Sequence, residues 1–396
     1  MALYELTEFL RLSAVLNYQL SARPLDLDNV LIVILGKKTL PERDSLILKN
    51  FIDYLEKVYG QKRRKMGPPA ILHPLRAASL LARAIEQPSM LDLVAELLHD
   101  NIEDINPEDF AAEDWSRLDE LFHACMEPLP ETDRWFLMER LRWLTKRSDE
   151  TYYSYIGRLL DLSRNTPEAV RVKLADRLDN TLDLRIDIED PLQGIDFFEG
   201  IFQMMFINTY RGTRPGMPHA RSAPPLNGSQ RLFQLFKNIV LMTLVRKRRS
   251  ALDDPAVKNL FNALAMAGMK EAQRIAVHIF SYHLTDISVQ RKLVFDAMQY
   301  VQKGGIDSVT SPGTGSRLDG LFISRFDDPV KKQRNQKLDD LYHDKALMVE
   351  AAIAFIVIFL SFLNDPDFYV KGVSEQGIQP GSPEGQAGGP WPTPSS

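Results

Sequence analysis

Apolar residues recur at every third or fourth position through most of this chain, which is the spacing of amphipathic helices. Between Asp44 and Tyr59 they fall at roughly i, i+4, i+5 and i+8. The same pattern predicts helices over about 91–103, 131–146, 150–164, 168–185 and 195–210, and later over 232–245, 255–267, 271–284 and 288–301. No clean strand alternation interrupts the first half, so the predicted fold class is all-α.

Changes in composition along the chain predict its domains. Residues 1–43 form an N-terminal extension that mixes helical periodicity with a β-rich run, Val30–Leu35. A helical domain is expected over 44–210, and a second, mostly helical domain over 231–372. Pro and Gly accumulate in 211–230, which indicates a linker. From Val373 onward, Gly, Pro, Ser and Gln without apolar anchors predict a disordered tail over 373–396.

The segment from Ala346 to Leu363 is apolar enough to require a comparison with a membrane span. Glu350 interrupts it, and the uninterrupted part from Ala351 covers 13 residues, fewer than the roughly 20 that cross a bilayer. We therefore interpret it as a buried core helix. Membrane association or an oligomer contact is the alternative.

Composition narrows the class of protein further. With 396 residues, 44% of them hydrophobic and 26% charged, the chain is typical of a soluble globular protein of two domains. A net charge of −5 argues against non-specific nucleic-acid binding. Cys125 is the single cysteine, which excludes an intramolecular disulfide and a thiolate metal cluster. The N-terminus lacks the basic and apolar regions of a secretory signal, so a reducing cytoplasm is expected.

Candidate metal ligands come from three separate segments. They are His73, the pair His99–Asp100, and Asp176. Two imidazoles and two carboxylates suit a divalent ion with open positions, which can bind a phosphate and activate a water molecule. The dipeptide alone is a weak signal, because His343–Asp344 repeats it just before the apolar helix. There Asp344 is better explained as an N-cap.

Two local patterns strengthen the candidate site. Glu103 lies four residues after His99 and three after Asp100, so on a helix all three side chains can point to one side. The alternative is a solvated helix end that carries surface acids. Asp176 and Asn180 share a helix face with Lys173, an arrangement that suits contacts to a metal, a phosphate and a base. The alternative there is a charged surface helix with a weak ion pair.

Three segments, taken in order, resemble the HD-domain superfamily and, more narrowly, the hydrolase domain of the RelA/SpoT group. They are residues 60–65 with 71–76, residues 97–104 and residues 173–180. The spacing agrees, since 26 residues separate His73 from His99 and 76 separate Asp100 from Asp176. The resemblance covers about 44–210 and implies an HD-domain helical bundle. Asp179 stands where the family usually has His or Tyr.

The resemblance implies a one-metal hydrolase that removes the 3′ pyrophosphate from guanosine 3′-diphosphate 5′-diphosphate. The implied ligands of the ion, usually Mn²⁺ in this family, are His73, His99, Asp100 and Asp176. An acidic pair, Glu103 and Asp104, would orient or deprotonate the attacking water. The implied substrate-binding residues are Arg64, Lys65, Tyr155, Lys173 and Asn180.

Two other functions remain open at this stage. One is an HD hydrolase of another nucleotide or phosphate ester, such as a 5′-nucleotidase-like enzyme. The other is a non-catalytic regulatory or scaffold protein that binds a nucleotide and, through its C-terminal helices, a protein partner or a second copy of itself. No counterpart of a synthetase domain is found, so hydrolysis without synthesis is expected. The expected partner is a small-molecule nucleotide, and neither nucleic acid nor a membrane is expected.

Overall fold

The computed structural model describes residues 5–378, apart from 23, 61, 65–67, 165, 187–225, 284–285, 314 and 375–376. Within those residues the fold is all-α, as the sequence predicts, with one two-stranded hairpin of two residues a strand. The helices before the gap at 187–225 are α1 (Leu6–Ser21), α2 (Leu27–Leu35), α3 (Glu42–Tyr59), α4 (Leu72–Ala84), α5 (Met90–Leu98), α6 (Asn101–Asp104), α7 (Ala112–Met126), α8 (Glu131–Leu144), α9 (Tyr152–Leu162) and α10 (Glu168–Asp183). After the gap come α12 (Gly228–Lys247), α13 (Pro255–His283), α14 (Ile287–Gln302), α15 (Lys331–His343) and α16 (Lys345–Asn364), with strands β1 (Val373–Ser374) and β2 (Gly377–Ile378).

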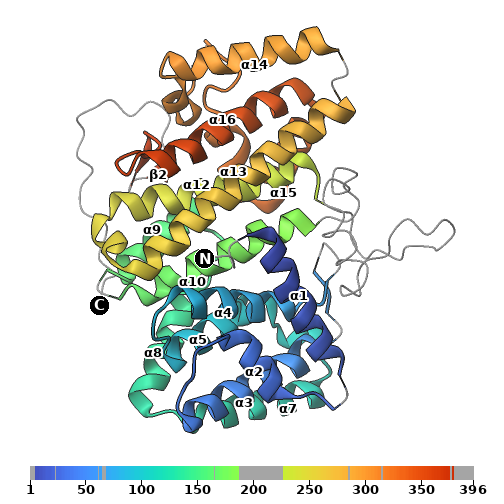
Figure 1. The fold of residues 1–396 in the computed structure, drawn as a ribbon, viewed down its shortest axis with the longest axis vertical. Coiled ribbons are helices and arrows are strands. Elements are labelled where there is room, and N and C mark those ends of the chain that lie inside the picture. The colour runs from blue at the N-terminus through green and yellow to red at the C-terminus, as the bar shows by residue number, and fades with distance from the viewer. Residues whose placement is uncertain are drawn as a thin grey trace, which may run out of the picture.

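The two halves of the chain pack against each other along α10. Figure 1 shows α1–α8 at one end of the molecule, α12–α16 at the other, and α10 between them. Helix α10 packs against α4 and α5 on one side and against α12 and α13 on the other. Most of its residues are buried, including charged ones such as Asp176 and Arg177. Helix α10 therefore presents polar side chains to both halves.

The second half is built around the pair α13 and α16. Helix α16 is the one described helix that is long and apolar enough to cross a membrane, and it is mostly buried inside the protein. It lies against α13 at Gly268, where an added Cβ would come within 2.7 Å of the Phe359 ring. Close contact at a glycine is typical of tightly packed helices. This packing is that of a core helix, and Asp344 caps its first turn by accepting from the Leu347 N–H at 3.0 Å.

Several local predictions from the sequence were wrong. The β-rich run Val30–Leu35 belongs to helix α2, which begins with an Asp26 N-cap and buries one apolar face, so tertiary packing overrides β propensity. The two helices predicted over 255–267 and 271–284 are one helix, α13. The tail predicted as disordered from Val373 begins with the hairpin, in which Val373 and Ile378 are buried. The helix predicted over 195–210 lies outside the described residues.

Candidate metal centre and its cavity

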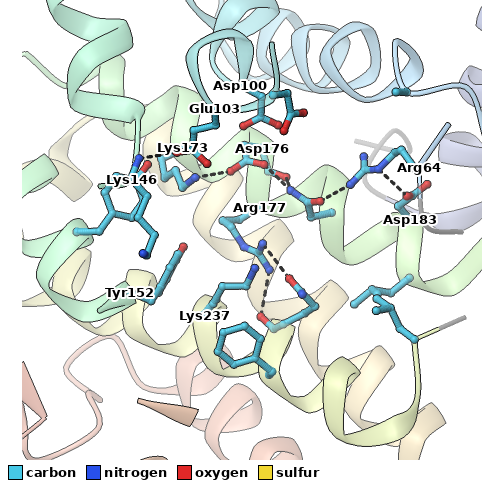
Figure 2. A pocket seen from close by; sticks show the side chains of 18 of the residues that line it. Arg64, Asp100, Glu103, Lys146, Tyr152, Lys173, Asp176, Arg177, Asp183 and Lys237 are labelled. Atoms are coloured by element: carbon cyan, nitrogen blue, oxygen red, sulfur yellow. Dashed lines mark hydrogen bonds and ion pairs between the residues drawn. The ribbon is translucent and has the colours of Figure 1, made fainter. Parts of the chain in front are cut away.

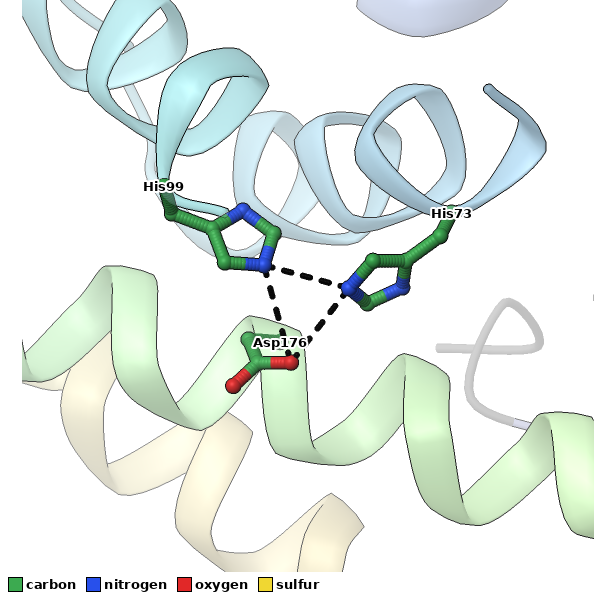
Figure 3. A group of neighbouring side chains, drawn as sticks. All are labelled: His73, His99 and Asp176. Carbon is green, nitrogen blue, oxygen red and sulfur yellow. Dashed lines mark hydrogen bonds and ion pairs between the residues drawn. The ribbon is translucent and has the colours of Figure 1, made fainter. Parts of the chain in front are cut away.

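His73 and His99 approach each other from two neighbouring helices. His73 lies in the first turn of α4, and His99 is the residue that ends α5. Their Nε2 atoms are 3.1 Å apart and both rings are buried (Figure 3). Two imidazole nitrogens at this separation point toward one small volume.

Two carboxylates complete this group. Asp176 Oδ1 from α10 lies 3.4 Å from His73 Nε2 and 3.6 Å from His99 Nε2 (Figure 3). Asp100 Oδ2 lies 3.2 and 3.3 Å from the same nitrogens. Donor atoms bound to one ion at about 2.0–2.2 Å lie roughly 2.8–3.6 Å apart. His73, His99 and Asp176 can therefore hold a metal ion, and Asp100 is placed to join them.

The charges of this group are strongly coupled. Burial and Arg64 would lower the pKa of His73, but Asp179, Asp100 and Asp176 outweigh them and raise it to about 9. Burial alone would raise the pKa of Asp176, but Lys173 and the two histidines hold this pKa well below its usual value. Side chains that share protons in this way can exchange those protons for a divalent cation.

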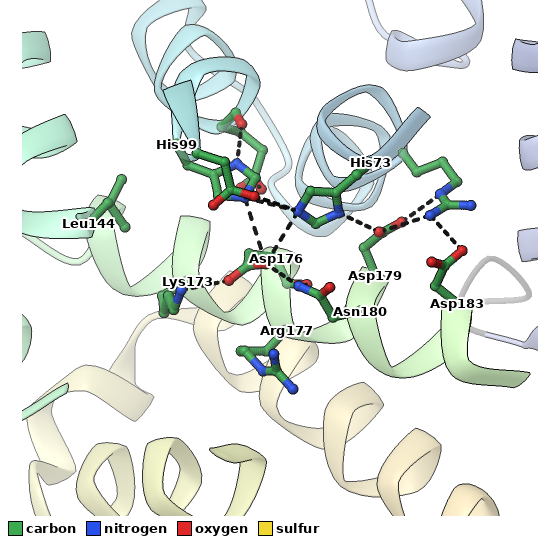
Figure 4. A network of polar contacts seen from close by, with 12 residues as sticks. His73, His99, Leu144, Lys173, Asp176, Arg177, Asp179, Asn180 and Asp183 are labelled. Carbon is green, nitrogen blue, oxygen red and sulfur yellow. Dashed lines mark hydrogen bonds and ion pairs between the residues drawn. The ribbon is translucent and has the colours of Figure 1, made fainter. Parts of the chain in front are cut away.

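Asp179 fixes the orientation of His73. Its Oδ2 atom lies 2.5 Å from His73 Nδ1, and Arg76 donates to both of its oxygens, at 2.8 and 3.1 Å (Figure 4). A carboxylate on one ring nitrogen sets the tautomer that leaves the other nitrogen free to bind a metal. The sequence marked Asp179 only as a departure from the family pattern. Its supporting position is a finding of the structure.

His99 is oriented from its own helix. Its Nδ1 atom lies 2.6 Å from the Glu96 carbonyl oxygen, so its Nε2 also faces the cluster. The Glu96 carboxylate is fully buried without a hydrogen-bond partner, and burial raises its pKa to about 8. The orientation of His99 therefore rests on the backbone and not on this side chain.

The acidic pair lies beside the cluster on α6, a separate short helix. Glu103 and Asp104 line the same cavity as Asp100. Glu103 accepts a hydrogen bond from the Lys146 backbone N–H. Partial burial and the charge of Asp100 raise the pKa of Asp104 to about 6. The helix predicted over 91–103 breaks at His99–Asp100, and this break turns the two acids toward the cavity.

The predicted phosphate-binding residues are already paired. Lys173 Nζ lies 2.7 Å from Asp176 Oδ2. Arg64 donates to Asn180 Oδ1 at 2.5 Å and lies 3.3 Å from Asp179 Oδ2. These cations therefore stabilise the acidic cluster in the structure described.

The remaining predicted substrate residues have different positions. Asn180 donates to the carbonyl and carboxylate of Asp176 (Figure 4). Tyr155 is buried, its hydroxyl donates to the Leu144 carbonyl, and its ring lies under Lys173 and lines the cavity. Lys65 lies outside the described residues.

A cavity of about 690 Å³ opens beside the cluster, within the usual range for small-molecule sites. Asp100 and Asp176 line one wall of it. The opposite wall comes from α9 and the segment before it, from α12, from the region of α15 and from Arg177 of α10, and it carries positive charge (Figure 2). No pattern in the sequence predicted this wall, whose basic residues are Lys146, Arg177, Lys237 and Arg334.

The site thus has the composition of a metal centre beside a nucleotide-sized cavity. Over 148 residues the chain is 31% identical to a protein of Mycoplasma pneumoniae described as a probable guanosine-3′,5′-bis(diphosphate) 3′-pyrophosphohydrolase. This stretch is 37% of the present chain and 19% of that relative. No family model matches the chain, and no solved structure shows a significant match. The similarity is to a hydrolase and covers only part of either protein.

Proposed function

We propose that this protein is a metal-dependent phosphohydrolase of the HD-domain superfamily that removes the 3′ diphosphate of guanosine 3′,5′-bis(diphosphate). The observation that carries the proposal is the convergence of His73, His99, Asp100 and Asp176 at the edge of the cavity. The two Nε2 atoms are 3.1 Å apart, and each carboxylate lies 3.2–3.6 Å from both of them. The partial identity to the Mycoplasma pneumoniae hydrolase supports the choice of substrate.

These four residues would hold the ion, for which we propose Mn²⁺. When bound, the ion polarises a phosphate oxygen and lowers the pKa of a water molecule. Asp179 and the Glu96 carbonyl keep the imidazoles oriented. Glu103 and Asp104 line the cavity beside Asp100, and this pair is our candidate for orienting or deprotonating the attacking water.

The reaction would be a hydrolysis. A water oxygen forms a bond to phosphorus, and the base takes up a proton of that water. The bond between the phosphorus and the ribose oxygen breaks, and the ribose oxygen takes up a proton to become the 3′ hydroxyl. The products are guanosine 5′-diphosphate and diphosphate. We further propose that residues 44–210 form the hydrolase unit, that 231–372 form a second unit and that the protein works in the cytoplasm.

Turnover of a nucleotide panel tests this proposal. The purified protein is incubated with Mn²⁺ and guanosine 3′,5′-bis(diphosphate), 5′-mononucleotides and simple phosphate esters, beside an Asp100→Ala variant. We expect the wild type to release diphosphate from guanosine 3′,5′-bis(diphosphate). The rate of this release should be more than 100-fold lower in the variant.

Two other results would replace the proposal. Release of phosphate from mononucleotides would indicate a 5′-nucleotidase-like enzyme. Binding of nucleotides without any metal-dependent turnover would indicate a regulatory or scaffold protein.

A further inference from the structure

The wall of the cavity opposite the metal centre carries cations that form no ion pair among the described residues. Lys237 on α12 makes no hydrogen bond or ion pair there, and its ammonium lies over the rings of Tyr152 and Phe233 at 5.8 and 5.3 Å. Arg334 on α15 lies over the same Phe233 ring at 4.9 Å and donates to the Asp328 carbonyl at 2.8 Å. The Asp328 carboxylate attracts Arg334 but forms its ion pair with Lys337, at 2.9 Å. The Arg334 Nε atom is buried without a hydrogen-bond partner.

Arg177 adds a third positive charge from α10. It is buried, and among the described residues its hydrogen bonds go to neutral oxygens: the side chain of Asn238 and both the side chain and the carbonyl of Gln234. These bonds fix its guanidinium without neutralising its charge. Figure 2 shows Arg177 and Lys237 directed into the same space below Asp176.

The positive charges act on one another. Burial lowers the pKa of Lys237 well below its usual value, and Arg177, Lys173 and Arg334 lower it further, against the opposing effect of Asp176. Buried like charges without counter-ions destabilise a fold. Such an arrangement is expected where an anionic ligand supplies the missing charge.

Neighbouring groups match a nucleotide in shape and polarity. Tyr152 has a buried hydroxyl without a hydrogen-bond partner, and its ring lines the cavity together with Phe233. Aromatic faces stack on bases, and a hydroxyl can donate to a phosphate oxygen.

We infer that Lys237, Arg334 and Arg177 form an anion-binding subsite. It binds a phosphate group at one end of a nucleotide whose other end lies at the metal centre. The substrate class is a nucleoside phosphorylated at two positions, and this assignment rests on the proposed function. Two of the three cations come from α12 and α15, outside residues 44–210. The C-terminal helices therefore complete the substrate site.

Binding of guanosine 5′-diphosphate tests the subsite without turnover. Titration calorimetry is carried out on the full chain in a metal chelator, with guanosine as the ligand that lacks phosphate. We expect Lys237→Met and Arg334→Gln each to weaken guanosine 5′-diphosphate binding at least tenfold and to leave guanosine binding unchanged. Lys237→Arg, which keeps the charge, should retain most of the affinity. Lys258→Met removes an exposed lysine of α13 and should bind as the wild type does.

Thermal unfolding of every variant shows that it is folded. Equal guanosine 5′-diphosphate affinity in Lys237→Met and wild type, or no binding by the wild type, would overturn the subsite. If no nucleotide is hydrolysed with Mn²⁺ but Lys237→Met still loses tenfold in affinity, the proposed hydrolysis fails and the subsite stands.

Discussion

The two walls of the cavity differ in whether their cations are paired with acidic side chains. On the wall beside the candidate metal centre, Lys173 has an acidic partner in Asp176. Behind that wall, the buried Arg76 is likewise paired with Asp179. On the wall made by α12 and α15, Lys237 and Arg334 form no ion pair among the described residues. The first wall is organised before any ligand arrives. The second depends on a ligand for its counter-charge.

This difference separates two tasks within one cavity. A metal centre needs rigid donors, and ion pairs behind the donors supply that rigidity. A subsite for phosphate needs cations that are free to bind an anion, and such cations reduce the stability of the fold. Substitutions on the two walls should therefore change different properties of the protein.

Asp176→Asn should have the largest effect, because it removes a donor of the metal centre and the partner of Lys173. We expect Mn²⁺ affinity to fall by more than about 100-fold, beyond the loss typical of residues that only support ligands. The metal-free protein should lose about 3 kcal/mol of unfolding free energy, because Lys173 stays buried and unpaired. Calorimetry with Mn²⁺ and urea unfolding in chelator measure both.

Asp161→Asn serves as the control for that experiment, since Asp161 is an exposed acid paired with Arg248 far from the metal centre. It should leave Mn²⁺ affinity unchanged. Unaltered Mn²⁺ binding by Asp176→Asn would remove Asp176 from the ligand set.

Asp179→Asn should have the next largest effect. An asparagine can still accept from His73 Nδ1 but loses the charge that orients the ring and pairs with Arg76. We expect metal affinity to fall about 10- to 100-fold, as for other groups that support metal-binding histidines. Mn²⁺ titration measures this, and circular dichroism checks the fold. An affinity within twofold of wild type would mean that His73 is held by packing alone.

Lys237→Met should have the opposite effect on stability. Since the pKa of Lys237 is lowered in the folded protein, the unfolded chain binds the proton more tightly, and folding is penalised at every pH below about 10.5. We expect the variant to be about 1–2 kcal/mol more stable at pH 7. The advantage should shrink as the pH rises toward 10.5. Urea unfolding at pH 7 and 9.5 measures it, and a variant less stable at pH 7 would mean that Lys237 has a structural partner.

Tyr152→Phe should have the smallest effect. The lost hydroxyl has no hydrogen-bond partner, so stability should stay within about 0.5 kcal/mol, while guanosine 5′-diphosphate affinity falls about threefold to tenfold. Tyr155→Phe is the matched control, because its hydroxyl donates to the Leu144 carbonyl and its removal should cost about 1 kcal/mol of stability. A nucleotide affinity that does not change in Tyr152→Phe would exclude this hydroxyl from the subsite.

The sequence predicted one wall of the cavity far better than the other. Each residue of the metal centre belongs to a short run of recognisable residues, and the structure brings these runs together from three helices. The roles of Glu96 and Asp179 were not predicted, because they depend on which atom of each residue faces His99 or His73. The spacing of residues in the sequence does not reveal that. The helical fold was predicted because apolar periodicity is strong in most helices.

The cationic wall could not be predicted in the same way. Lys237 lies in α12, a helix with apolar residues on most sides, where a single lysine is no signal. Arg334 lies in α15, which has too few apolar residues to show periodicity and was not predicted as a helix. Helix α7 was missed as well. Charges that converge from unrelated helices leave no local pattern, and only tertiary structure reveals them.

The position of α10 between the two walls has a thermodynamic consequence. Asp176 and Arg177 are adjacent in it, and they belong to opposite walls. A cation bound at Asp176 and an anion bound at Arg177 carry opposite charges at neighbouring positions and therefore attract each other. The two binding equilibria are therefore linked, and each ligand should raise the affinity for the other by the same factor.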